Sequence, residues 1–251
     1  MNTSASGSAQ QDKVGGLAAL YLAAAYVVAM PYFLVFVKYT NVVDPVERVN
    51  LLISNHDSMR IMNLITYVVF GIVLAVMALT LHARLRRGAS ALSQAATVVG
   101  CTWAVMLVAS GLTFNAGMAA VVDLHATSPA QAVSAWQTIE PVAQGLGSSG
   151  GELLGGLWVL LVSLAALRGA ALPKALNWCG VAVGAAGVLS VVPALADLAY
   201  VFGLLQIVWF VWLGIVMLRT ASRRLVPAVP AERVDVAARL SGNGLDRGRR
   251  Y

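Results

Sequence analysis

One carboxylate, Glu152, lies in a segment that otherwise consists of apolar and small residues, GSSGGELLGGLWVLLVSLAAL from Gly147 to Leu167. A charged side chain inside a bilayer is costly. Such residues therefore face the interior of a helix bundle, pair with a partner, and mark a functional site by default. We expect Glu152 to face the bundle and to bind an oppositely charged side chain, a small solute or an ion.

Four further polar residues complete a predicted binding site on the outer face. Arg60, in NHDSMRIMN, is the outer-side cation at the mouth of a predicted helix, and we predict that it pairs with Glu152 or Asp197. Asp57 competes for the same arginine, and Asn115 offers an amide inside a predicted span, where such groups usually bond to a neighbouring helix. The alternatives are an ion pair that only fixes the register of the helices, or a Glu152 carboxyl that extends toward the membrane surface with a raised pKa.

A weaker set of outer residues has the donor types of a metal site. These are His56, Asp123, His125 and Glu140, whose nitrogen and oxygen atoms suit divalent transition metals. Their spacing matches no known metal motif, and the alternative is that the loop histidines are simply solvated.

Several enzyme classes are excluded by what the sequence lacks. The stretch GSSG at 147–150 resembles the serine motif of rhomboid proteases, but the last three predicted spans contain no histidine to act as the base. The histidines His56, His82 and His125 fall at helix ends or in a loop, which argues against a bis-histidine haem. We therefore predict no catalytic residue and no cofactor, and we do not expect an enzyme.

The composition requires that lipid surrounds most of the chain. Hydrophobic residues make up 59% of the 251 residues and charged residues 11%, with a mean hydropathy of +0.78. Soluble domains carry about 25% charged residues. We predict an all-α, polytopic integral membrane bundle, because six apolar runs reach the roughly 20 residues that cross a bilayer. These runs are 14–37, 61–81, 95–122, 147–167, 177–196 and 198–218.

The basic residues predict how the chain crosses the membrane. Fourteen of the 17 Lys and Arg residues fall in the two termini and in the loops on the same side as the termini. By the positive-inside rule, both termini face the cytoplasm of a plasma (inner) membrane. The arginines of the C-terminal tail are expected to touch anionic headgroups, so we expect the lipid bilayer and no nucleic acid as a partner.

The chain divides into a disordered tail (1–13), a transmembrane domain (14–219) and a basic, largely disordered cytoplasmic tail (220–251). Asp44 before Pro45 predicts the start of a short outer helix. A second outer helix is expected to start at Ser128 and to end at Pro141, with Trp136 at the headgroup level. Glycines 147, 151 and 155, with 180 and 184, predict close packing of the fourth and fifth spans.

The chain resembles a bacterial family of six-helix membrane proteins that is known only as a domain of unknown function. The resemblance rests on GLAALYLAAAYV, on the outer helix that leads to Arg60, and on LLVSLAALRGAALPKALNWCGVAVGAAGVLSVV, with Pro173 followed by a basic residue. It covers most of residues 14–219. It implies a helical bundle in the plasma membrane and no reaction. The glycines around Glu152 depart from the family, whose members are more uniformly aliphatic there.

Two functions remain open from the sequence. The first is binding or transport of a small cation, a proton or a polar solute at the acidic outer mouth. The second is a non-catalytic accessory subunit or scaffold, for which a membrane partner subunit or a second copy of the chain would be the partner. A third hypothesis, an outer-face metal-binding protein, depends on His56, Asp123, His125 and Glu140.

Overall fold

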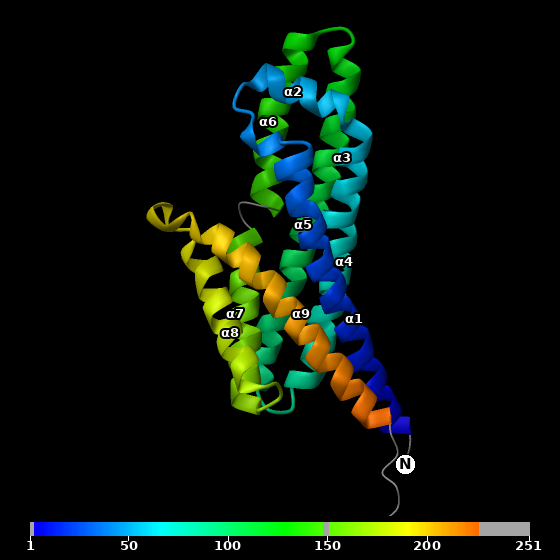
Figure 1. The fold of residues 1–251 in the computed structure, drawn as a ribbon, viewed down its shortest axis with the longest axis vertical. Coiled ribbons are helices and arrows are strands. Elements are labelled where there is room, and N and C mark those ends of the chain that lie inside the picture. The colour runs from blue at the N-terminus through cyan, green and yellow to red at the C-terminus, as the bar shows by residue number, and fades with distance from the viewer. Residues whose placement is uncertain (1–2, 148–150, 226–251) are drawn as a thin grey trace, which may run out of the picture.

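The computed structural model describes residues 3–147 and 151–225, and in this part the chain is helical throughout, without a β-strand (Figure 1). The expected all-α class is confirmed for this part. The α-helices are α1 (Thr3–Pro31), α2 (Pro45–Ser54), α3 (His56–Asn63), α4 (Phe70–Leu85), α5 (Ser90–His125), α6 (Pro129–Gly147), α7 (Gly151–Gly169), α8 (Lys174–Leu189) and α9 (Leu198–Leu225). Short π-helical turns η1 (Tyr32–Phe36) and η3 (Leu64–Val69), and 3-10 turns η2 (Tyr39–Asn41) and η4 (Pro193–Leu195), connect them.

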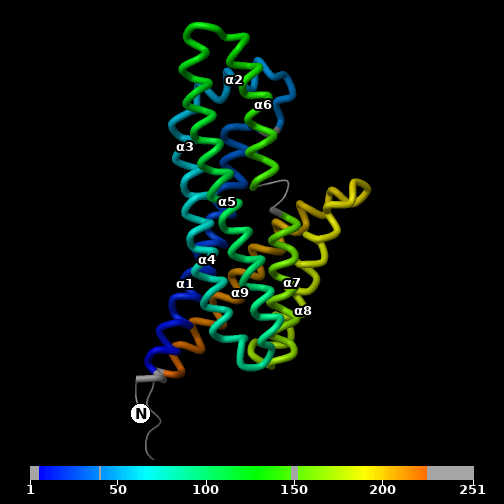
Figure 2. The backbone as a smooth tube through the Cα atoms, turned by 180° about the vertical axis from the view of Figure 1, so that it is seen from behind, coloured from blue at the N-terminus to red at the C-terminus, as the bar shows by residue number. Residues whose placement is uncertain are grey.

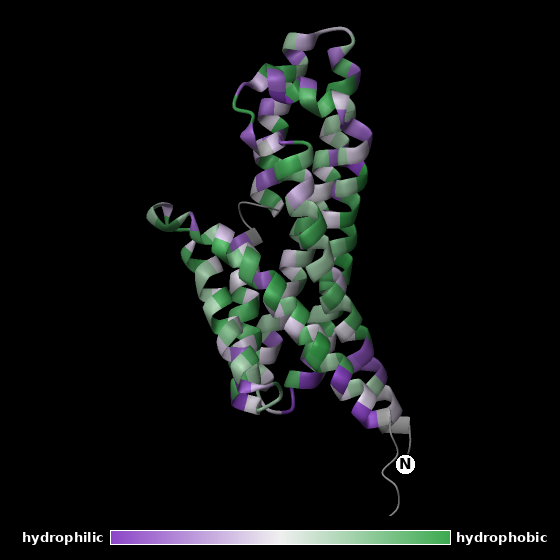
Figure 3. Cartoon of the chain, in the orientation of Figure 1, coloured by the Kyte–Doolittle hydropathy of each residue, from purple (hydrophilic) through white to green (hydrophobic). Residues whose placement is uncertain are grey.

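Five helical stretches are long and apolar enough to cross a membrane, which indicates a multi-pass membrane protein. In the described part of the chain they are Ser6–Phe36, His56–Leu85, Ser90–His125, Pro129–Gly169 (α6 and α7, on either side of the undescribed residues 148–150) and Leu198–Arg224. The sixth expected span, at 177–196, corresponds to α8, which is apolar but has only 16 residues. Figure 3 shows that the middle of the bundle is mostly hydrophobic, while hydrophilic residues gather at its lower end and in its upper part.

Two hydrophobic cores follow one another along the long axis of the molecule (Figures 1 and 2). The larger core belongs to α1, α4, α7, α8, α9 and the first part of α5, which we call the main bundle. The smaller core includes Val49, Leu52, Met118 and Trp136. It lies in residues 32–63 and 111–147, which we call the distal lobe. Helix α5, with 36 residues or about 54 Å at 1.5 Å per residue, runs through both.

Helix α6 packs along the distal part of α5 and ends where α7 begins. The hydroxyl of Ser110 donates to the carbonyl of Ala143 over 2.7 Å, and Gly147 lies against Ser110. Our prediction that Pro141 ends this helix is wrong, because α6 continues to Gly147. A proline inside a helix removes one backbone hydrogen bond, and the packing of α6 against α5 offsets that loss.

The predicted ends of the outer helices are otherwise confirmed. The carboxylate of Asp44 accepts a hydrogen bond from the backbone N–H of Val46 over 3.2 Å, and Pro45 is the first residue of α2. Helix α6 begins at Pro129, directly after Ser128. Trp136 does not lie at an exposed interface, because it is 2% exposed and its indole N–H donates to the hydroxyl of Tyr39.

The N-terminal segment differs from our prediction of a disordered tail. Residues from Thr3 onward belong to α1. Asp12 is buried and forms ion pairs with Arg84 of α4 and Arg224 of α9, both over 2.9 Å. Arg84 also donates to the carbonyl of Ala171, between α7 and α8. The ion pairs tie the first part of α1 to α4 and α9, and Arg84 extends the network to the connection between α7 and α8. The expected C-terminal tail beyond residue 225 lies outside the described residues.

Close packing of α7 against α8 is confirmed, although through a different glycine than expected. A Cβ on Gly156 would lie 2.8 Å from the carbonyl oxygen of Gly184, and a Cβ on Gly184 would lie 2.7 Å from the carbonyl oxygen of Gly156. Gly155 instead faces Trp103 and Phe202. Small residues let helix backbones approach in lipid, so this contact joins α7 and α8 into a rigid pair.

Candidate functional site

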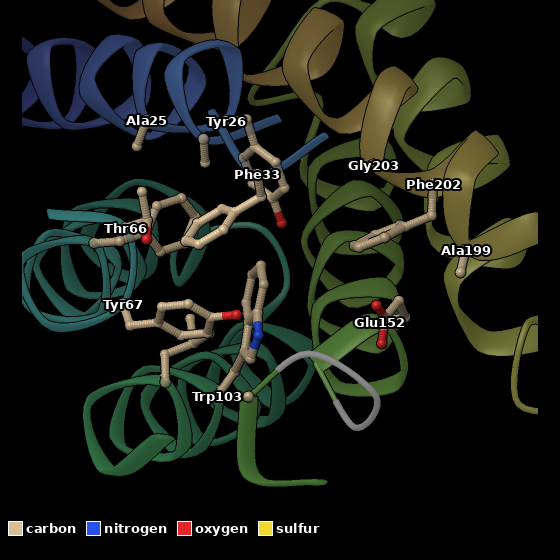
Figure 4. Close-up of a pocket in the computed structure, with 14 residues that line it drawn as sticks. Ala25, Tyr26, Phe33, Thr66, Tyr67, Trp103, Glu152, Ala199, Phe202 and Gly203 are labelled. Carbon is tan, nitrogen blue, oxygen red and sulfur yellow. The ribbon is translucent and has the colours of Figure 1, made fainter. Parts of the chain in front are cut away.

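A pocket of about 190 Å³ lies in the main bundle near its junction with the distal lobe (Figure 4). Residues of α1 and α9, among them Tyr26 and Phe202, form opposite sides of it, and residues of α5, such as Trp103, close it. Helices α1 and α9 pack tightly further down, where a Cβ on Gly16 would lie 3.1 Å from the carbonyl oxygen of Gly214. The pocket therefore forms where these two helices separate (Figures 1 and 2).

Glu152 lines this pocket from the first turn of α7. Its side chain is half-buried, and Figure 4 shows its carboxylate across the pocket from the rings of Tyr26 and Tyr67. Among the described residues, no other side chain forms an ion pair or a hydrogen bond with it. The orientation that we expected, toward the bundle, is what the structure shows, but the expected side-chain partner is absent from the described part.

Aromatic rings make up most of the pocket wall. Tyr26, Phe33, Tyr67, Phe70, Trp103 and Phe202 all line it. Tyr26 meets Phe70 edge to face, with centroids 5.4 Å apart and an angle of 79° between the planes. Phe70 meets Trp103 at 6.2 Å and 69°. Because neighbouring rings are nearly perpendicular, the wall turns corners and encloses the space as a box.

Two π-helical turns supply part of this box. Phe33 belongs to η1, which follows Pro31, and Thr66 and Tyr67 belong to η3. Proline removes a backbone donor at its position, which helps to explain why the regular helix gives way at η1. In η3, the carbonyl of Ile65 accepts from the backbone N–H of Phe70 and also from the hydroxyl of Tyr21, over 2.8 Å. Such π-helical segments occur frequently at functional sites.

The pocket wall also contains a buried donor without a partner. The indole nitrogen of Trp103 has no hydrogen-bond partner in the described part of the protein, although Trp103 is only 2% exposed. Leaving a buried donor unpaired costs about 1–3 kcal/mol. Because this nitrogen is shielded even from water, as are those of Trp158 and Trp209, the groups that the pocket offers to a ligand are the carboxylate of Glu152 and the aromatic rings.

The other residues of the predicted acidic mouth do not join Glu152. Arg60 is exposed on α3 and forms no ion pair with Glu152 or Asp197 within the described residues. Asp197 is exposed before α9, and Asp57 pairs with its neighbour His56 over 3.2 Å. The predicted pairing of Arg60 is therefore wrong, because α3 belongs to the distal lobe while Glu152 belongs to the main bundle.

Asn115 forms a contact between helices, as expected of such an amide. Its side-chain NH₂ donates to the backbone carbonyl of Arg60 over 3.2 Å, and its oxygen accepts from the amide of Asn63 over 3.4 Å. Asn63 is buried. These bonds join α5 to α3 inside the distal lobe, and Asn115 does not line the pocket.

The metal candidates do not form a site. No group of three His, Cys, Asp or Glu side chains in the described residues could hold a metal ion. Glu140 is instead buried and forms an ion pair with Arg48. In the described residues, the acidic side chain that pairs with His56 is Asp57, which is not one of the four metal candidates. The outer-face metal-binding hypothesis is therefore not supported by the described part.

The distal lobe contains a polar network that the sequence did not reveal. The guanidinium of Arg48 donates to both carboxylate oxygens of Glu140, over 3.3 and 3.2 Å, and to the carbonyl of Val42, over 3.0 and 2.6 Å. It also lies 5.5 Å from the centre of the Tyr39 ring. Burial, together with the negative charge of Glu140, raises the pKa of Tyr39 above its ordinary value of 10.0. This network links α2, η2 and α6.

The spacing of aromatic residues in the sequence predicts the pocket only in part. Tyr26 and Phe33 are seven residues apart and Tyr67 and Phe70 three apart, so each pair lies on one face of its helix. That spacing is equally typical of a packed core. No protein-family model, curated protein or solved structure matches the chain, so the geometry of the pocket is the basis for assigning a function.

Proposed function

We propose that the chain is a six-span plasma-membrane protein that binds, and moves across the bilayer, a small cation or polar solute at the Glu152 pocket. The observation that carries this proposal is the unpaired carboxylate of Glu152 inside a pocket, in a segment surrounded by apolar residues. An ionised group in that position needs a compensating charge. The described residues supply none, and a bound cation in the pocket would supply it.

The length of the main bundle along its long axis supports placing the bilayer around it. Helix α5 rises about 30 Å from Ser90 to Ser110, which equals the hydrocarbon thickness of a bilayer. Ser110 lies at the level of Gly147, the residue of α6 that also lines the pocket. At the other end lie Asp12, Arg84 and Arg224. The pocket thus occupies the outer part of the membrane, and the distal lobe stands outside it.

This placement is compatible with six crossings and with cytoplasmic termini. Helix α8 takes the fifth crossing although it rises only about 24 Å, because η4 and the residues around it extend the connection toward α9. The basic residues at the Asp12 end agree with a cytoplasmic position of both termini. The distal lobe, with the carboxylate of Glu140 and the amide side chains of α6, then faces the outside.

The test compares Glu152→Gln with Glu152→Leu in the full-length purified protein. Thermal unfolding in detergent and binding of inorganic cations and small polar solutes are measured for both. We expect Gln to abolish binding while the protein stays folded, and Leu to abolish binding and raise the unfolding temperature, because it removes a desolvated charge. Unchanged binding in Glu152→Gln would refute the proposal.

The accessory-subunit function has one specific observation in its favour. Phe36 and Val43 of the distal lobe are 79% and 88% exposed. Both are large apolar side chains that the described part of the chain leaves uncovered, and a membrane partner that packs on them would bury them. Co-purification with a membrane partner that is lost in a Phe36→Ser, Val43→Ser double variant, with Glu152→Gln silent, would favour this function.

A further inference from the structure

We infer that the ligand of the Glu152 pocket is an organic ammonium ion with an apolar body, held by cation–π contacts to the aromatic box and by the charge of Glu152. This inference rests on the proposed function and names its ligand class. Two features of the pocket support it, namely the number of rings and the carboxylate of Glu152.

The ring wall favours a positive charge that is spread over a bulky group. The faces of tryptophan, tyrosine and phenylalanine attract cations within about 6 Å, and aromatic cages are the usual sites for quaternary ammonium groups. Tyr26, Phe70 and Trp103 form consecutive walls at nearly right angles. A rounded cation that enters this box touches several rings at once.

The same wall disfavours an inorganic ion. Ca²⁺ takes six to eight oxygen ligands and Mg²⁺ needs octahedral oxygen coordination. Glu152 is the one carboxylate that lines the pocket, and the described residues contain no cluster of three metal-binding side chains. An alkylammonium ion needs no coordination shell, because its methyl or methylene groups pack against rings while one carboxylate balances its charge.

The indole of Trp103 contributes its ring to the pocket wall and not a polar contact. Its N–H has no partner among the described residues, but the nitrogen is shielded even from water, as are the unpaired indole nitrogens of Trp158 and Trp209 outside the pocket. Figure 4 shows the ring of Trp103 between Tyr67 and the side of the pocket that holds Glu152. The pocket therefore suits an ammonium ion whose remaining groups are compact and apolar.

The test uses two probes of the same shape and different charge. Choline and its neutral analogue 3,3-dimethyl-1-butanol are titrated into the full-length protein in detergent, at constant ionic strength set with sodium chloride. Binding is followed by calorimetry and by the fluorescence of the buried tryptophans. We expect choline to bind and the neutral analogue to bind at least about tenfold more weakly, because a desolvated cation–π contact alone corresponds to about that factor in Kd.

A matched pair of variants tests the ring. Tyr26→Phe keeps the aromatic face and removes the hydroxyl, whereas Tyr26→Leu removes the face and keeps an apolar side chain. We expect Phe to leave choline binding within about twofold and Leu to weaken it by about tenfold. Phe33→Leu repeats the comparison at a second ring, in case Tyr26→Leu does not fold.

The outcomes separate the inference from the proposed function. Equal affinity for choline and the neutral analogue, or unchanged choline binding in both ring-to-leucine variants, would overturn the inference. If sodium or another inorganic cation binds with dependence on Glu152 while choline does not, the inference fails and the proposed function stands. If no cation binds with dependence on Glu152, both fail.

Discussion

The Arg48–Glu140 pair in the distal lobe predicts an asymmetric loss of stability. The side chain of Glu140 is 6% exposed, and that of Arg48 is 28% exposed. Arg48→Ala leaves the carboxylate buried without its partner and also frees the carbonyl of Val42. Breaking a buried pair in this way costs about 3–5 kcal/mol.

The reverse substitution is expected to cost less. Glu140→Ala leaves the guanidinium of Arg48 with its bonds to Val42 and its contact with the Tyr39 ring, and its exposed part reaches water. We expect a cost of about 2 kcal/mol, below the value for a fully buried charge. The double variant Arg48→Met, Glu140→Leu removes both charges and is expected to regain most of the loss.

The assay is thermal and denaturant unfolding of the full-length protein in detergent, followed by circular dichroism and by the fluorescence of its six tryptophans, one of which, Trp136, bonds to Tyr39. Asp57→Ala is the matched control, because it breaks the ion pair with His56, in which the Asp57 side chain is 82% exposed. Such an exposed pair contributes about 0–1 kcal/mol. Equal losses for Arg48→Ala and Glu140→Ala, or a double variant less stable than both, would refute this reasoning.

The structure predicts the outcome of three further perturbations. Gly184→Val places a side chain against the backbone of Gly156, so it should separate α7 from α8 and lower the unfolding temperature by several degrees. In the control Gly203→Ala, the new Cβ has no atom within 4 Å, so the unfolding temperature should not change. Gln206→Leu should raise the unfolding temperature, because both polar atoms of the buried Gln206 lack partners in the described residues; a lowered temperature would show that a bound water or another group satisfies them. Since the pKa of Tyr39 is raised by folding, the stability that its neutral hydroxyl contributes should be lost as pH rises above 10.0, and Tyr39→Phe should reduce that loss; an unchanged pH profile would contradict it.

Composition and periodicity predicted the helical class, the positions of most long helices and the start of α2. These depend on local chemistry: apolar runs of sufficient length, an aspartate before a proline, and glycines at helical spacing. The contact between α7 and α8 was predicted for the same reason, but through Gly155 instead of Gly156, because a glycine-rich run does not specify which of two adjacent glycines faces the neighbouring helix.

The contacts around the site could not be predicted from the sequence, because they depend on how distant helices pack. Arg60 looked like the partner of Glu152 because both lie near predicted outer helix ends. The structure shows that the helices extend into a distal lobe, which carries Arg60 away from the pocket. Arg48 and Glu140 are 92 residues apart and come together only because α2 packs on α6. The helical conformation of residues 3–13 likewise depends on ion pairs of Asp12 with distant arginines.

The central claim, that an ionised Glu152 faces a pocket open to the outside, can be tested by the chemical modification of one pocket cysteine. Ala199→Cys, at a lining residue of α9, is made after replacement of the native Cys101 and Cys179 by alanine. Membrane-impermeant cationic and anionic thiol reagents of matched size are applied to sealed vesicles of each orientation. We predict that the cationic reagent reacts faster from the outside and that Glu152→Gln removes this preference. Reaction from the cytoplasmic side alone, or a cationic preference that persists without the carboxylate, would contradict the account.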